Sequence, residues 1–206
     1  MRFIYEDDFR NKLAAFGMEP DGEGRELRYR DGSATLGFDF TNLAVPTADD
    51  SLYESSGAGE RGVEQAMARV IFKLVEGLNR FPVYVFASDD EWGGGEELAP
   101  FVATGRLSKR EAAAMAGVVE GKHRMDVGVI GPGEGETAAA LIVPQTTLFQ
   151  GTCHVVAEGG AYWVTFSPDE EVSFNTRGQA VYDAARAALL AMGPLPFEVV
   201  WVEDFL

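Results

Sequence analysis

The sequence predicts an α+β fold, with antiparallel or mixed sheets and about four helices packed on one face. Four segments carry apolar residues at helical spacing, and short segments of alternating polarity, joined by glycine turns, lie between them. The order of elements does not follow a βαβαβ series. A chain of 206 residues is long enough for one large core. We therefore expect a single domain over residues 1–206, with residues 98–107 as the place for any sub-domain boundary.

The first two helices are predicted from apolar stripes. Phe9 and Leu13 lie one turn apart and predict an amphipathic helix over residues 6–16. Gly17 follows, and it can end that helix in a left-handed conformation. A longer stripe of seven apolar residues, opposite charged residues, predicts a second helix over residues 61–79.

Two further helices are predicted to begin at capping boxes. In this motif a Ser or Thr side chain and a Glu or Gln side chain three residues later each bond a free backbone N–H. Ser108 and Glu111 form the first such pair, and Thr176 and Gln179 form the second. Gly193, followed by proline, is predicted to end the fourth helix.

Two hairpins are predicted from paired segments of alternating polarity around glycine-containing turns. The paired segments are residues 26–30 with 34–40, and residues 152–157 with 162–166. Asp31 and Gly32 occupy the first turn, because this dipeptide tolerates the positive φ angles of a tight hairpin. Glu158, Gly159 and Gly160 occupy the second turn.

Other apolar segments predict further strands. Residues 83–86 and 197–202 each follow a long helix and have the composition of buried strands. Residues 125–130 predict another strand, whereas residues 138–143 are compatible with either a strand or a helix.

The order of predicted elements in the first half of the chain resembles the order in the second half. Residues 6–86 and 108–202 each begin with a helix, continue with a hairpin and a second helix, and end with a strand. A pseudo-duplication of one helix-hairpin-helix-strand unit would explain this. A chance recurrence of a common order explains it equally simply, because residue identity between the halves is slight.

Charge is the strongest compositional feature. The chain has 33 acidic and 17 basic residues, a net charge of −16, two His and one Cys. Such a charge repels nucleic acid and anionic membranes, so we expect neither as a partner, and it favours basic proteins. Its simplest alternative role is to keep the protein soluble. With one Cys, no apolar run of 18 residues and an acidic start, we expect a cytoplasmic protein without an internal disulfide.

Two acidic loops are the candidate contact sites for a basic partner. The side chains concerned are Asp89, Asp90, Glu91, Trp92, Glu96 and Glu97 in the first loop, and Asp169, Glu170 and Glu171 in the second. An exposed indole at Trp92 would suit a partner with basic and apolar groups. The first loop lacks the spacing of a calcium-binding loop, and a solvated loop is the alternative interpretation. We expect no metal, no cofactor and no catalytic residue.

A local excess of basic residues lies between residues 106 and 124. It either complements the acidic loops, within one chain or across a dimer, or holds an anionic ligand. The candidate anion-binding residues are Lys122, His123 and Arg124. A dyad of the neighbouring Cys153 and His154 is not expected, because adjacent residues of a strand point to opposite faces.

Residues 51–87 resemble part of an uncharacterised family of small bacterial proteins. The similarity rests on Leu52-Tyr-Glu-Ser-Ser-Gly-Ala-Gly59, followed by a long helix that contains Ala66 and then by an apolar strand. The resemblance implies a compact bacterial α+β domain, and it implies no activity.

These observations favour a non-enzymatic cytoplasmic binding protein, monomeric or homodimeric. Immunity proteins, antitoxins and specialised chaperones are of this kind, and a basic protein partner would meet the acidic loops. One alternative is a small hydrolase or metal-dependent enzyme built from carboxylates, with His123 or His154 as the base. The other is a structural or assembly component.

Overall fold

The computed structural model describes residues 1–20, 26–41, 58–88, 92–95, 98–119, 126–168 and 171–202. Its centre is an eight-stranded sheet in which all neighbouring strands are antiparallel. In spatial order the strands are β1 (Arg2–Ile4), β6 (Val127–Ile130), β5 (Val83–Ala87), β7 (Cys153–Ala157), β8 (Trp163–Phe166), β9 (Glu171–Thr176), β4 (Leu36–Thr41) and β10 (Glu198–Val202). The first and last strands of the chain, β1 and β10, therefore form the two opposite edges of one sheet.

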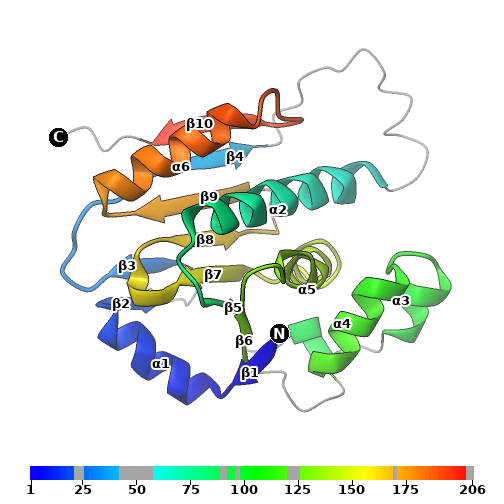
Figure 1. Cartoon of the computed structure of the whole chain (residues 1–206). Helices are drawn as coiled ribbons and strands as arrows, with labels where there is room; N and C mark the ends of the chain where they lie inside the picture. Colours follow the sequence, from blue (N-terminus) through cyan, green and yellow to red (C-terminus); the bar gives the residue numbers. More distant parts are fainter. Residues whose placement is uncertain are drawn as a thin grey trace.

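Helices cover one face of this sheet (Figure 1). The helices of this layer are α2 (Ala58–Leu78), α4 (Lys109–Val119), α5 (Gly135–Thr147) and α6 (Gln179–Ala191), with the short α3 (Ala99–Ala103) beside α4. The main core lies between them and the sheet, and it includes Phe38, Phe174, Ile71 and Leu141, each at most 1% exposed. The predicted α+β class, with helices packed on a sheet, is confirmed.

A smaller core lies on the opposite face. Helix α1 (Glu6–Ala15) and a two-stranded sheet of β2 (Met18–Pro20) and β3 (Leu27–Tyr29) pack there against β5, β6, β7 and β8. Phe9 of α1 contacts Tyr84, and Tyr29 of β3 contacts Trp163. Among the described residues, this second core contains none from β9, β4 or β10.

Several sequence predictions are confirmed. Helices α1 and α2 match the two predicted from apolar stripes, and Gly17 has the expected positive φ of 74°. The capping box of α4 is present, because Ser108 N donates to Glu111 Oε2 at 2.8 Å and Glu111 N donates to Ser108 Oγ at 3.2 Å. Strands β7 and β8 form the predicted second hairpin.

The predicted first hairpin is wrong. The turn at Gly32 exists, with a φ of 69°, but β3 pairs with β2, whereas β4 pairs with β9 and β10. The two segments separate because they belong to different cores. Phe38 of β4 stacks on Phe174 of β9 in the main core, and Tyr29 of β3 packs in the smaller one. The two halves of the chain consequently do not share one strand pairing.

One open choice is resolved, and two further predictions are corrected. Residues 138–143 lie within helix α5, which resolves the open choice between strand and helix. Strand β10 is an edge strand with alternating exposure, so residues 197–202 are not a buried strand. Thr176 does not form a capping box with Gln179, because Gly178 is the N-cap of α6 and the Thr176 hydroxyl donates to Ala161 O at 2.7 Å.

None of the described helices is both long enough and apolar enough to cross a membrane.

Candidate functional site

A cavity of about 870 Å³ lies on the face of the sheet opposite the main helical layer. Its floor consists of residues from β8, β9 and β4, and its wall consists of β3 and the connection from β3 to β4; Gln150 and Thr152, which precede β7, also line it. We call this cavity the sheet groove. The smaller core, which contains α1, does not extend over β9 and β4, and the groove lies on that uncovered part of the sheet.

The floor is polar because, along β4, β9 and β8, residues that face the groove alternate with residues that face the main core. In β4, Phe38 and Phe40 belong to the main core, so Asp39 between them faces the groove. In β9, Ser173 and Asn175 line the groove, and the residues between and beside them face the helices. The same alternation places Thr165 of β8 on the floor.

Strand register aligns three of these polar side chains in one row with the buried His154. His154, Thr165, Ser173 and Asp39 are directly opposite one another on β7, β8, β9 and β4. His154 is fully buried, its ring packs on Phe86, and its Nδ1 lies 3.0 Å from Thr165 Oγ1. Cys153 belongs to the main core on the other face, so the expectation that it cannot pair with His154 is confirmed.

Carboxylates outnumber cations in the groove. Among its described lining residues, Asp39, Glu171 and Glu26 are acidic and Arg28 is basic. Asp39 is opposite Ser173, and Glu171 lies two residues before Ser173 on the same face, so the two carboxylates are diagonal neighbours. Partial burial, followed by the negative charge of Glu171, raises the pKa of Asp39. The groove therefore has an electrostatic preference for a bound cation.

The groove wall is held by contacts of Tyr29. Its ring lies edge-on to Trp163, with centroids 5.1 Å apart, and its hydroxyl donates to Gly160 O at 3.0 Å. Burial is the main cause that raises the pKa of Tyr29. The guanidinium of Arg177 lies over the Tyr29 ring, 4.5 Å from its centroid, and its Nη1 lies 3.5 Å from Asp31 Oδ2. The wall is consequently fixed to β8 and to the end of β9.

The structure places few of the residues that the sequence suggested as contacts. Most of them lie outside the described residues: Asp89, Asp90, Glu91, Glu96, Glu97, Lys122, His123, Arg124, Asp169 and Glu170. Glu171 is described; it is exposed at the start of β9 and lines the sheet groove.

The expected exposure of Trp92 is wrong. Trp92 begins the short helix η2 (Trp92–Gly95) and is 1% exposed. Its indole N–H donates to Asp126 O at 3.0 Å, and Gly93 N donates to Gln145 Oε1 at 2.7 Å. The glycines after Trp92 suggested an open loop. Burial of the large apolar indole in the main core, however, is more favourable in free energy than its exposure to water. Trp92 therefore anchors its segment to the protein interior.

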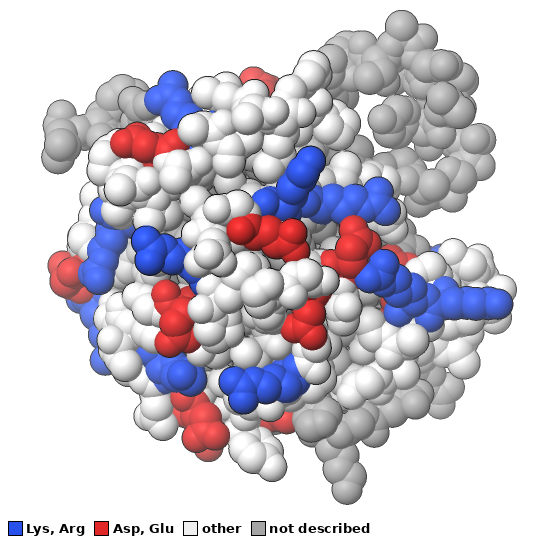
Figure 2. Space-filling model, viewed as in Figure 1, with Lys and Arg blue, Asp and Glu red and all other residues white. Residues whose placement is uncertain are grey.

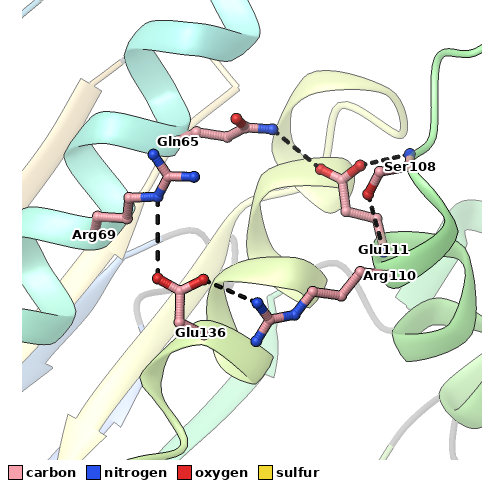
Figure 3. A network of polar contacts seen from close by, with 6 residues as sticks. All are labelled: Gln65, Arg69, Ser108, Arg110, Glu111 and Glu136. Atoms are coloured by element: carbon pink, nitrogen blue, oxygen red, sulfur yellow. Dashed lines mark hydrogen bonds and ion pairs between the residues drawn. The ribbon is translucent and has the colours of Figure 1, made fainter.

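The helical side holds a separate network of polar contacts (Figure 3). Glu111 of the capping box also accepts a bond from Gln65 of α2 at 3.4 Å. Glu136 of α5 lies 3.1 Å from Arg110 of α4 and 4.0 Å from Arg69 of α2. These bonds join three helices, and the Arg110 contact favours the view that part of the basic region complements the chain's own carboxylates.

Charges of both signs are mixed on the molecular face shown in Figure 2. Lys and Arg groups there lie between Asp and Glu groups, and no large area of one sign is visible in the described part. Within the described ranges, no set of three or more His, Cys, Asp or Glu side chains is arranged to hold a metal ion. The candidate site is the sheet groove, because its cavity and its aligned polar side chains lie together.

Sequence reasoning missed the groove residues Asp39, Thr165, Ser173 and Asn175. The available signal was the alternation of aromatic and polar residues in 36–41 and 171–176, which shows that one strand face avoids the core. No protein-family model, curated protein or solved structure matches the chain, so the site is interpreted from its own geometry. The resemblance of residues 51–87 to a bacterial family stays a prediction.

Proposed function

We propose that this protein is a non-enzymatic binding protein that receives a basic part of a protein partner in the sheet groove. The observation that carries the proposal is the pair of carboxylates, Asp39 and Glu171, on the floor of a cavity of about 870 Å³. A cavity of this size is large enough for several side chains of a partner.

The electrostatics of Asp39 support a cationic ligand. Partial burial and the nearby Glu171 make its ionised form unfavourable, as the raised pKa of Asp39 indicates. The positive charge of a guanidinium or ammonium group placed between the two carboxylates would offset both effects, because it favours the ionised form of Asp39. Binding would therefore stabilise the charged groove, and it would weaken as salt screens the attraction.

The two acidic loops remain contact candidates in addition to the groove. Of the 33 acidic residues, 15 fall in the segments outside the described residues, against three of the 17 basic residues. The loop at 169–171 is continuous in sequence with β9, because Glu171 is both its last residue and a groove residue.

The alternative of a carboxylate and histidine enzyme has less support. A general base must reach its substrate. His154 is fully buried, and among the described lining residues of the groove there is no histidine. His123, the other candidate base, lies outside the described residues.

Binding of a basic probe tests the proposal. We expect a fluorescein-labelled arginine-rich peptide to bind the protein at low salt, and the double variant Asp39→Asn, Glu171→Gln to bind it at least tenfold more weakly. Asp183→Asn is the matched control, because Asp183 is an exposed carboxylate on α6, on the helical side. Equal binding by the double variant and the control would contradict the proposal.

A further inference from the structure

The strand next to Asp39 at the edge of the sheet gives the groove an apolar border. Val200 of β10 is directly opposite Asp39 in the register, so its side chain lies on the same face. Val200 and Val202 are each 40% exposed, and they are among the few large exposed apolar residues of the described structure. Their inward neighbours, Val199 and Trp201, pack on the main core.

On this face of the sheet, the boundary between the acidic and the apolar side chains therefore runs between β4 and β10. Asp39 and Glu171 are on one side of this boundary, and Val200 and Val202 are on the other. Directly opposite side chains on antiparallel neighbours have Cβ atoms about 4.5–5.5 Å apart. A ligand that places a cation over the carboxylates can thus place an apolar group over Val200.

The length of the groove floor suits a short extended segment. From β8, across β9 and β4, to the apolar border at β10 there are three strand spacings of about 4.8 Å each, or about 14 Å, which is the length of about four extended residues. In an extended segment, residues i and i+2 point to the same side and lie about 7 Å apart. This separation fits a basic group midway between β9 and β4, which is one and a half strand spacings, or about 7 Å, from an apolar group over Val200 on β10.

We propose that the partner enters the sheet groove as an extended peptide segment in which a Lys or Arg lies two residues from an apolar residue. The basic group lies between Asp39 and Glu171, and the apolar group covers Val200. This inference rests on the proposed function, and it adds the conformation and the residue pattern of the partner. It also assigns a specificity role to Val200.

Three synthetic peptides test the pattern by fluorescence anisotropy. The first has three repeats of Arg-Ser-Val-Ser, the second has Ser in place of every Val, and the third has Glu in place of every Arg. We expect the first to bind three- to tenfold more tightly than the second, and the third not to bind. Val200→Thr, which nearly preserves shape and strand propensity, should remove the difference between the first two peptides.

The possible results separate the two proposals. If the two arginine peptides bind equally and Val200→Thr changes neither, the segment pattern is wrong and the basic-partner proposal stands. If neither arginine peptide binds, the proposed function itself fails. If the free protein is a dimer that Val200→Thr converts to a monomer, a second copy of the chain occupies this edge, and the peptide proposal is overturned.

Discussion

At the scale of single residues, Asp39 connects the stability of the fold with the proposed binding. It is half-buried in an alternating strand, between two phenylalanines of the main core, and Glu171 is its diagonal neighbour. Burial first, and Glu171 second, raise the pKa of Asp39. A titratable group whose surroundings disfavour its charged form in the free protein is typical of a ligand-binding site.

The pH dependence of stability follows from that shift. The folded protein holds the Asp39 proton to a higher pH than the unfolded chain, so the contribution of Asp39 to stability falls as pH rises through the interval between the two pKa values. We expect Asp39→Asn to raise the free energy of unfolding at pH 7, and this gain to disappear near pH 3. Urea unfolding at both pH values measures it. A loss of stability at pH 7 would contradict the environment described for Asp39.

Trp92 gives a second residue-scale prediction. Trp92→Phe keeps an aromatic ring but leaves the buried carbonyl of Asp126 without the indole N–H bond. We expect the free energy of unfolding to fall by about 1–3 kcal/mol, with unchanged affinity for the arginine peptides. Unchanged stability together with weaker peptide binding would instead identify Trp92 as an exposed contact residue.

At the scale of elements, the helix starts differ in how they are stabilised. Helix α4 begins at a complete capping box of Ser108 and Glu111. Helix α6 begins at Gly178, and the side chain of Gln179 donates along the helix to Asp183 at 2.9 Å. The same sequence pattern therefore produces a cap at one helix and none at the other, because Ala161 and Gly178 both bind the hydroxyl of Thr176.

This difference predicts unequal effects of two alanine substitutions. Ser108→Ala should lower the free energy of unfolding by about 0.5–2 kcal/mol, because an N-cap acceptor is lost. Gln179→Ala should change it by less than about 0.5 kcal/mol, since only a surface contact is removed. Thermal or urea unfolding of both variants checks the comparison. A larger loss in Gln179→Ala than in Ser108→Ala would contradict the assignment of the caps.

Single helices and one local hairpin could be predicted from the sequence, but the partners of strands that are distant in sequence could not. Helices α1 and α2 follow from periodicity alone, and the β7–β8 hairpin follows from a glycine turn between two apolar segments. The separation of β3 from β4 could not be predicted, because it depends on the contact of Phe38 with Phe174, more than a hundred residues away. The groove has the same origin, since its floor forms only when β4 joins β9.

At the scale of the whole molecule, the net charge of −16 affects folding and binding differently. Mutual repulsion of like charges destabilises the compact state, whereas attraction of a cationic peptide stabilises the complex. Raising the ionic strength from about 0.01 M to about 0.15 M shortens the screening length from about 30 Å to about 8 Å. Both effects then weaken.

We therefore expect opposite responses to salt. The melting temperature should rise with salt, and the affinity for arginine peptides should fall. Calorimetry and anisotropy at the same salt concentrations measure the two quantities. A melting temperature that falls with salt would mean that ion pairs such as that of Arg110 with Glu136 outweigh the net repulsion.

The proposed ligand site is the polar sheet groove, on the face of the sheet away from the main helices. Backbone amide chemical-shift mapping of the ¹⁵N-labelled protein, titrated with the Arg-Ser-Val-Ser peptide, tests it most directly. We expect the largest shifts at Asp39, Thr165, Ser173 and Asn175, with Val200 beside them. Shifts confined to α2, α4 and α5, with an unchanged groove, would contradict it.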